Sequence, residues 1–379
     1  MSLRSLPAVE ISGEPRTRGR QYGEAARERI HRAHAFYAEA FRESTGLAWD
    51  GVTERAKRWV APARAFAPDL VEEMEGIADG SGLDFLDVLA LNARGEIIYD
   101  STFAGMLADD DRRDGCTSFA LLDEASGDGH VYCGQNWDWR HGVQDTLMVL
   151  RIVQPPKPTV VMHVEAGQVG RQGANSAGIA LNANGLGGRF DDVVGVPQTM
   201  IRRRVLDSAR LDHALAALVK SNGHIASNAL VTHRDGFAID IETTPAAHGW
   251  MYPTDGLLVH GNHYEAFRPT QLADRYRPAS VDSLYRVPRA TEGLRRCRTA
   301  SGSAETRKLI HGAMTDHLGF PESLCTHPDP AQPPLKRSAT LLSNCVDLTT
   351  GDYLIAEGTP CDHEYESVPW NIYDGPGGQ

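Results

Sequence analysis

The feature that most constrains this chain is a change of sequence pattern at about residue 109. The residues before it are rich in Ala, Glu and Arg, and their apolar positions recur at helical spacing, as in Ala33, Phe36, Tyr37 and Ala40. After the polar, turn-forming run DDDRRDG, short stretches rich in Val, Leu, Tyr and Trp alternate with turns that contain Gly and Pro. This order favours an α+β layered fold with antiparallel sheets over a parallel βαβ fold.

The first part of the chain reads as helix throughout. One helix is expected over 18–42, and a second stretch is broken by Pro62 and Pro68 and ends near Gly80. A third helix is expected to begin at Asp84, whose side chain is a suitable N-cap. The pattern therefore predicts an all-helical leader over residues 1–115.

The remaining residues, 116–379, are expected to form the β-rich body of the protein. Short runs that carry Val, Leu, Tyr and Trp between turn residues mark the strands, and three helical stretches interrupt them. The expected strands and hairpins are at 117–123, 130–139, 146–154, 159–167, 171–188, 228–243, 256–264 and 339–358, and the helices are at 197–210, 211–221 and within 281–318.

Composition and charge exclude several classes of function. The 379 residues include 38 basic and 50 acidic side chains, a net charge of −12, with no long run of either sign. A basic surface for nucleic acid or anionic lipid is therefore not expected. No apolar run approaches the roughly 18 residues of a membrane span, and the first residues lack a secretory signal. We expect a cytoplasmic enzyme without nucleic-acid or membrane partners.

The sequence offers no familiar metal or cofactor motif. It contains no GxSxG, P-loop, HExxH or GxGxxG pattern, and none of its six cysteines forms a CxxC pair. His260 and His263 lie close together but have no third ligand at fitting spacing. We therefore predict no metal and no cofactor, and we expect free thiols that act as small buried apolar side chains, with the exception of Cys116.

Cys116 opens a predicted strand directly after Asp114-Gly115. A thiol in this position can attack the carbonyl of the flexible Gly115 and shift the peptide to a thioester, which water then cleaves. Cleavage would expose the α-amino group of Cys116, whose reference pKa of about 7.7–8.0 suits a base at neutral pH. A thiol beside its own amine is an activated nucleophile. A buried strand cysteine without a chemical role is the alternative.

Four segments together carry a resemblance to a known family: DGCTSFALL, GQNWDW, GANSAGIALNANGLGG and HGNHYE. The chain resembles the acyl-coenzyme A:6-aminopenicillanic acid acyltransferases, self-processing N-terminal-nucleophile (Ntn) enzymes of peptidase family C45. It is more distantly similar to bile salt hydrolases and penicillin V acylases. The resemblance implies an αββα four-layer sandwich, self-cleavage between Gly115 and Cys116, and acyl transfer by Cys116. The 1–115 and 116–379 fragments would stay associated as one folded unit.

The resemblance also implies roles for individual residues. Cys116 matches the nucleophile, and Asp138 matches an aspartate that holds its α-amino group. Asn262 matches an asparagine that stabilises the oxyanion, and Arg337 lies where the family tends to keep an arginine near the thiol.

Further candidates for oxyanion or substrate binding flank these positions. Asn182 or Asn184 is a second oxyanion donor or a turn residue, whereas Asn175 is expected to stabilise a turn. Gln135 and Asn136 precede the Asp138 motif. The bile-salt-hydrolase branch has an arginine where this chain has Gln135, which argues against bile salts as substrates.

The expected reaction is cleavage of a non-peptide C–N bond in a small acylated amine or amide. Release of the acyl group to water would make the enzyme an amidohydrolase. Release to another amine, or use of acyl-CoA as donor, would make it an acyltransferase. One alternative is a papain-like hydrolase that pairs Cys116 with His260 or His263 and is not self-cleaved. Another is a protein of the same fold that binds a ligand without turnover.

Overall fold

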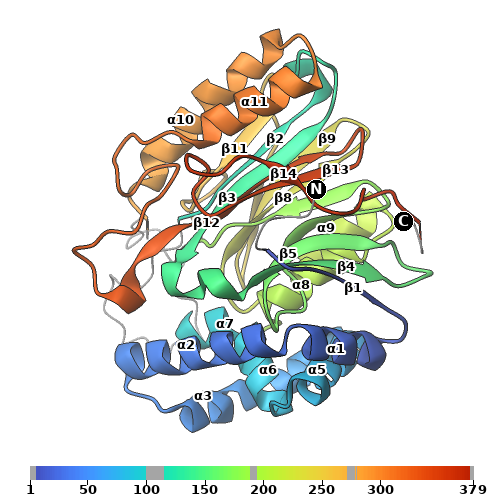
Figure 1. Ribbon diagram of the computed structural model, residues 1–379, viewed down its shortest axis with the longest axis vertical. Helices are drawn as coiled ribbons and strands as arrows, with labels where there is room; N and C mark the ends of the chain where they lie inside the picture. The colour runs from blue at the N-terminus through green and yellow to red at the C-terminus, as the bar shows by residue number, and fades with distance from the viewer. Residues whose placement is uncertain (1–5, 100–114, 188–193, 271–277, 279, 376–379) are drawn as a thin grey trace.

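The computed structural model describes residues 6–99, 115–187, 194–270, 278 and 280–375. Two β-sheets lie face to face, and helices cover their outer sides (Figure 1). The large sheet has eight strands in the order β1-β4-β5-β6-β7-β8-β9-β10, and the small sheet has six in the order β11-β2-β3-β12-β13-β14. This layer order confirms the predicted αββα sandwich.

The large sheet and its two covering helices contain most of the middle of the chain. Its strands pair antiparallel except β1, which lies parallel to β4. The strands are β1 (Ala8–Ser12), β4 (Leu147–Val153), β5 (Val160–Glu165), β6 (Gln172–Asn175), β7 (Ile179–Asn182), β8 (Ser227–His233), β9 (Phe237–Thr243) and β10 (His248–Met251), and the helices are α8 (Gln198–Leu206) and α9 (Leu211–Val219).

The small sheet joins the start of the body to its C-terminal part. Its central strands β2, β3 and β12 are neighbours although β12 follows β3 by about 200 residues in sequence. The strands are β2 (Thr117–Leu121), β3 (Tyr132–Arg140), β11 (Leu257–His260), β12 (Ser338–Asp347), β13 (Asp352–Glu357) and β14 (Glu366–Ser367), and the covering helices are α10 (Ser283–Leu294) and α11 (Ser303–Met314).

The leader contributes a group of helices at the lower end of the sandwich in Figure 1. They are α1 (Pro15–Ala25), α2 (Arg27–Thr45), α3 (Trp49–Ala56), α4 (Val60–Phe66), α5 (Pro68–Ser81), α6 (Phe85–Asn92) and α7 (Arg94–Tyr99). Pro68 begins α5 as predicted, and Asp84 caps α6 through a capping box with Asp87. Because β1 lies in the large sheet, the leader is not all-helical. Of the five residues of β1, only Ile11 is buried, so the sequence carries no alternating pattern that would predict this strand.

Glycines allow α1 and α5 to cross at very short range. A Cβ added to Gly19 would lie 1.9 Å from the carbonyl oxygen of Glu73, and one added to Gly76 would lie 2.2 Å from that of Arg16. No side chain fits at these positions, so the two helices pack backbone against backbone.

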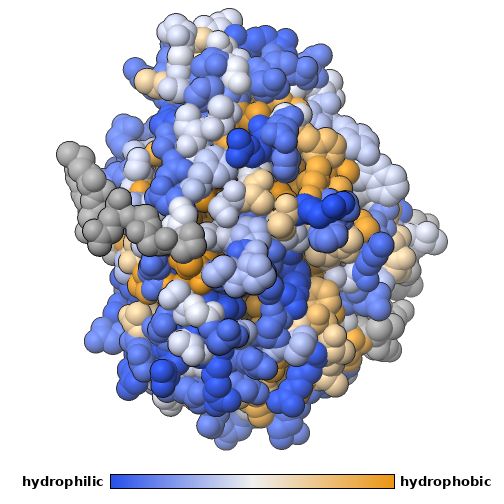
Figure 2. All heavy atoms as spheres, turned by 90° about the vertical axis from the view of Figure 1, so that its right-hand side faces the viewer, coloured by the Kyte–Doolittle hydropathy of each residue, from blue (hydrophilic) through white to orange (hydrophobic). Residues whose placement is uncertain are grey.

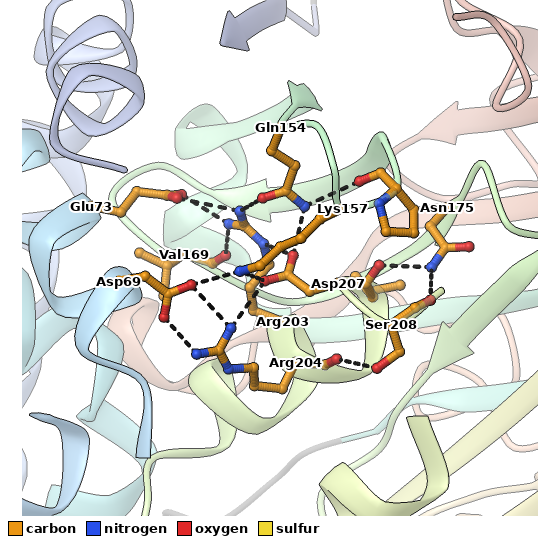
Figure 3. Close-up of polar contacts among 12 residues, drawn as sticks. Asp69, Glu73, Gln154, Lys157, Val169, Asn175, Arg203, Arg204, Asp207 and Ser208 are labelled. Atoms are coloured by element: carbon orange, nitrogen blue, oxygen red, sulfur yellow. Dashed lines mark hydrogen bonds and ion pairs between the residues drawn. The ribbon is translucent and has the colours of Figure 1, made fainter. Parts of the chain in front are cut away.

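The leader and the body share one hydrophobic core. Tyr22, Ile30 and Trp59 of the leader belong to the same buried cluster as Met148 and Val164 of the large sheet. A buried ion network lies beside this core (Figure 3), in which Arg203 of α8 donates to Glu73 of α5 and to Asp207. Burial of apolar surface and paired charges thus both connect residues 6–99 to the body.

One face of the molecule is mostly hydrophilic, with hydrophobic areas between the hydrophilic ones (Figure 2). Among the described residues, no helix has the length and apolar character needed to cross a membrane. All six cysteines are free thiols, as predicted, but Cys361 is exposed and so differs from the expected buried apolar side chain.

Candidate active site

Strand register brings three distant segments together at the start of β2. Thr117 of β2 pairs with Asn136 of β3, so continuing this antiparallel register places Gly115 opposite Asp138. On the other side, Ser118 pairs with His260 of β11, so the same reasoning places Cys116 opposite Asn262. The predicted nucleophile, aspartate and asparagine therefore meet although they span about 146 residues of sequence (262 − 116).

Gly115 and Cys116 pack directly against Asp138. Cys116 is only 1% exposed, and its Sγ lies 3.6 Å from the backbone oxygen of Asp138. A Cβ added to Gly115 would lie 3.1 Å from Oδ2 of Asp138. A larger residue at position 115 would crowd this carboxyl group. Gly115 and Asp138 also line a small cavity of about 30 Å³, together with Thr326 and His327.

The Asp138 carboxyl group is fully buried between two hydroxyl donors. Thr340 Oγ1 lies 2.6 Å from its Oδ1, and Thr326 Oγ1 lies 3.1 Å from its Oδ2. Burial raises the pKa of Asp138 to about 8, although Arg286 and the two threonines act in the opposite direction. In the intact chain this carboxyl group is thus mostly protonated at neutral pH, and a neighbouring cation would favour its charged form.

Arg286 of α10 connects the nucleophile to Asn262. Its Nη1 donates to the carbonyl oxygen of Cys116 at 2.7 Å and to Oγ1 of Thr117, and its Nη2 donates to Oδ1 of Asn262 at 2.9 Å. The side chain is fully buried, and Nε pairs with Asp282 at 2.6 Å. Burial alone would lower the pKa of Arg286, but Asp282 and Asp138 raise it. A permanent positive charge therefore lies beside Cys116.

A second buried polar group fixes the loop that carries Asn262. His260 Nε2 donates to Glu242 Oε1 at 2.9 Å, and Glu242 Oε1 also accepts the backbone N–H of Glu265 at 2.6 Å. Burial alone would lower the pKa of His260, but Asp240 and Glu242 raise it to about 10. The Asn262 side chain donates through Nδ2 to the carbonyl of Gly185 at 3.0 Å.

The papain-like alternative assigned His260 or His263 to the thiol, and both rings have other partners. His260 Nδ1 lies 2.9 Å from the Gly261 carbonyl, and its Nε2 bonds to Glu242. His263 Nδ1 lies 2.7 Å from Ser283 Oγ. Burial, together with His260 and Arg286, lowers the pKa of His263 to about 4.

Two of the further candidates lie beside the site. Asn184 Nδ2 donates to Ser118 Oγ at 3.1 Å and to the carbonyl oxygens of His260 and Gly261. Gln135 Nε2 donates to Asn184 Oδ1 at 2.6 Å. These two amides connect the inner faces of the two sheets and hold the backbone on which Asn262 depends.

The other candidates point elsewhere. Asn182 contacts the thiol of Cys133, and Asn136 Nδ2 donates to the carbonyls of Met314 and Leu324 on the helix-covered side of the small sheet. Asn175 does stabilise a turn, because its Oδ1 accepts the N–H groups of Ala177 and Ile179.

Arg337 bonds within its own loop, and Arg286, which binds the Cys116 carbonyl, is the arginine that sequence reasoning missed. The half-buried Arg337 donates to the carbonyls of Gln332 and Pro330 in its own loop. Arg286 forms an i,i+4 pair with Asp282, a pattern that is common on exposed helix faces. The sequence signal was therefore present, but it looked like a surface ion pair.

Two sequence comparisons agree with this geometry. A model of the family described as acyl-coenzyme A:6-aminopenicillanic acid acyl-transferase matches residues 125–313. The 40 kDa form of acyl-coenzyme A:6-aminopenicillanic-acid-acyltransferase from Emericella nidulans is 29% identical over 264 residues, which cover 67% of this chain and 68% of that protein. The chain is thus similar to this acyltransferase family over about half to two thirds of its length. It is an enzyme of the acyltransferase type.

Solved structures of two other enzymes are similar to a lesser degree. A variant of conjugated bile acid hydrolase from Clostridium perfringens is 14% identical, with a TM-score of 0.47, and the match covers 69% of this chain and 95% of that one. Penicillin V acylase from Agrobacterium tumefaciens is 17% identical, with a TM-score of 0.39, and the match covers 64% and 83% of the two chains.

Proposed function

We propose that this chain is a zymogen that cleaves its own Gly115–Cys116 bond and then uses Cys116 to transfer the acyl group of an N-acyl amide. One observation carries the proposal. The Gly115–Cys116 junction lies against the buried Asp138 carboxyl group, while Arg286 binds the Cys116 carbonyl and orients Asn262. Nucleophile, proton carrier and fixed positive charge thus converge on one peptide bond.

In the self-cleavage step, Sγ of Cys116 attacks the carbonyl carbon of Gly115. The C–N bond between the two residues breaks, a thioester C–S bond forms, and the nitrogen takes up a proton to become an α-amino group. Asp138, protonated in the intact chain, is placed to supply that proton, and the proton that leaves the Cys116 thiol restores it, so that one proton moves overall from sulfur to nitrogen. Water then hydrolyses the thioester, which releases the Gly115 carboxylate and restores the thiol.

In turnover, the α-amino group of Cys116 would accept the thiol proton and pass it to the departing amine. Asp138 would hold the ammonium form through a charge-assisted hydrogen bond. Asn262 uses one N–H of its amide on Gly185, and its second N–H can donate to the oxyanion of the tetrahedral intermediate. The acyl-enzyme thioester is then released to water or to an acceptor.

The leader is expected to remain bound after cleavage. It shares the hydrophobic core of the large sheet, and β1 stays paired with β4 through residues that are not near the junction. The buried pairs Arg203–Glu73 and Arg94–Glu165 also connect leader and body.

Intact mass of the purified chain tests the proposal directly. The wild type should appear as fragments of 115 and 264 residues (379 − 115), and Cys116→Ala should stay whole. Cys133→Ala is the matched control, because Cys133 is also a buried cysteine, on the adjacent strand β3, and its variant should still be cleaved. A full-length wild type, or a cleaved Cys116→Ala, would refute self-processing at this bond.

Substrate assays separate the two possible acceptors. The name of the Emericella nidulans relative includes acyl-coenzyme A, which makes acyl-CoA the first donor to test beside simple N-acyl amides. Product that forms from an amide in water alone indicates hydrolysis. Product that requires an added amine indicates transfer. Activity of an uncut chain that depends on His260 or His263 would instead support the papain-like alternative.

A further inference from the structure

Four side chains of metal-ligating type converge next to the Cys116 site, and one of them, His327, also lines the small cavity beside Gly115 and Asp138. His317, Cys325 and His327 belong to the loop after α11, and Cys361 follows β13. One ligand atom from each lies within 4.8 Å of all the others. No short motif announces the group, because His317 and Cys361 are 44 positions apart (361 − 317).

The separations match the edges of a tetrahedron around zinc. Zn–S bonds of about 2.3 Å and Zn–N bonds of about 2.0–2.1 Å imply N···N edges of about 3.3 Å and S···N edges of about 3.6 Å. Nε2 of His317 and Nε2 of His327 are 3.1 Å apart. The thiols of Cys325 and Cys361 lie 3.7 and 3.4 Å from Nε2 of His327. All three distances fall within about 0.2 Å of the expected edges.

We propose that His317, Cys325, His327 and Cys361 form a structural Zn²⁺ site of the Cys₂His₂ type. Two thiolates and two imidazoles form the donor set that zinc prefers, and four protein ligands leave no open position for catalysis. Ion entry is direct, because His317 and Cys361 are exposed while Cys325 is buried. The proposal departs from the expectation of no metal that was drawn from the sequence.

The backbone around the ligands is already ordered for such a site. The N–H of Cys325 donates to the carbonyl of Asp316 at 3.0 Å, and the N–H of His327 donates to that of Pro321 at 2.9 Å. On the second segment, Asp362 N–H donates to the carbonyl of Thr359 at 3.1 Å, which forms a turn at Cys361. Zinc would join two loops whose local shapes are fixed but which are far apart in sequence.

The cluster lies on the loop that contacts Asp138, so a bound metal would affect the active site. Thr326 lies between the ligands Cys325 and His327, and its Oγ1 donates to Oδ2 of Asp138. Fixing this loop would hold the hydroxyl group on Asp138. This consequence rests on the proposed function of Asp138, whereas the metal site itself does not.

Metal analysis of the reduced, purified chain tests the site without any activity assay. We expect about one zinc per chain after desalting, and at least about tenfold less in His317→Ala and in Cys361→Ser. Because both positions are exposed, these variants should keep the fold, which circular dichroism and thermal melting check. His213→Ala on the exposed face of α9 and Cys116→Ala should both retain zinc.

Cobalt supplies a second readout. Co²⁺ bound in place of zinc should give the visible bands of a tetrahedral ion and thiolate charge-transfer bands, both lost in Cys361→Ser. The site is refuted if reduced wild type with one added equivalent of zinc retains less than about a tenth of an equivalent. Equal retention by Cys361→Ser, or a Cys325–Cys361 disulfide with no bound metal under reducing purification, would refute it too. A wild-type chain that binds zinc but does not cleave itself would contradict only the proposed function.

Discussion

Two fully buried arginines do different work in this molecule. Arg203 is surrounded by charge, because it bonds to Glu73, Asp207 and Gln154 (Figure 3). Arg286 has one carboxylate partner, Asp282, and directs its other N–H groups to the Cys116 carbonyl, Thr117 and Asn262. Arg203 closes the contact between leader and body, whereas Arg286 holds polar groups at the proposed nucleophile.

The difference teaches how to separate a structural charge from a functional one. Two carboxylates neutralise Arg203, so little of its charge is available to anything else. Arg286 retains positive potential directed at neutral oxygen atoms, where negative charge would develop during acyl transfer. Burial alone does not distinguish them, since both are 0% exposed.

The largest effect is expected from Arg203→Met. The change removes the charge-assisted hydrogen bonds of Arg203 to Glu73 and Asp207, each worth about 1.5–3 kcal/mol, so the free energy of unfolding should fall by about 3–5 kcal/mol. Glu73 keeps its pair with Arg18, and Asp207 keeps its pairs with Lys157 and Arg204. Urea denaturation of the Cys116→Ala chain, which keeps leader and body covalently joined, measures this loss. Arg210→Met, on an exposed ion pair, is the control and should leave the midpoint unchanged. In the chain that retains Cys116, folded Arg203→Met should still cleave itself at low temperature. Loss of self-cleavage there would mean that Arg203 also acts in the reaction and differs less from Arg286 than proposed.

Arg286→Lys should act on the reaction rather than on the leader contact. Lysine keeps the positive charge but cannot bond to Cys116, Thr117 and Asn262 together. Loss of one or two charge-assisted hydrogen bonds, worth about 1.5–3 kcal/mol each, should slow self-cleavage by about 10- to 100-fold or more. The fraction of 264-residue fragment against time gives the rate. Wild-type cleavage by Arg286→Lys would remove Arg286 from the proposed site.

Asp138 should make the intact chain less stable as the pH rises. Its pKa of about 8 in the folded chain exceeds its unfolded value of 3.8, so the folded state binds a proton that the unfolded state releases. The free energy of unfolding therefore falls between about pH 4 and pH 8, and is insensitive to this group outside that range.

Asp138→Asn in the Cys116→Ala background tests this sign. Asparagine carries no charge, so the free energy of unfolding should decline less steeply with pH in this variant. Relative to its parent, Asp138→Asn should therefore gain a few kcal/mol of stability between pH 4 and pH 8. Denaturation curves across this range provide the measurement. Asp235→Asn, on an exposed turn, should keep the slope of the parent. Parallel curves for Asp138→Asn and its parent would mean that Asp138 is charged in the intact chain.

Sequence predicted what depends on local pattern. Runs of β-forming residues between turn residues placed β2, β3 and β12, and helical spacing with Pro68 and Asp84 placed the leader helices, because each signal lies within a few neighbouring residues. The motif resemblance also identified Gly115, Cys116, Asp138 and Asn262, which the strand register brings together.

Features built from distant residues were missed. β1 is stabilised by β4, about 140 residues away, and has too little pattern of its own. The ligand group around His327 combines two loops, so no spacing rule could reveal it. Asn136 and Asn182 seemed suitable for a site because of their motif, but Asn136 donates to the carbonyls of Met314 and Leu324, and Asn182 contacts the thiol of Cys133. These partners are distant in sequence, so the motif could not show them.

The smallest effect is expected from Arg337→Ala, and this variant compares the arginine assigned by resemblance with the arginine assigned by geometry. The Arg337 side chain donates to two carbonyls of its own loop, at 3.0 and 3.2 Å. A change at such a position is usually worth less than about 0.5 kcal/mol, so the self-cleavage rate should change by no more than about twofold. Side-by-side time courses of Arg337→Ala and Arg286→Lys check the ranking. If Arg337→Ala were the slower of the two, the residue placed by motif position, and not the buried Arg286, would carry the charge that the reaction needs.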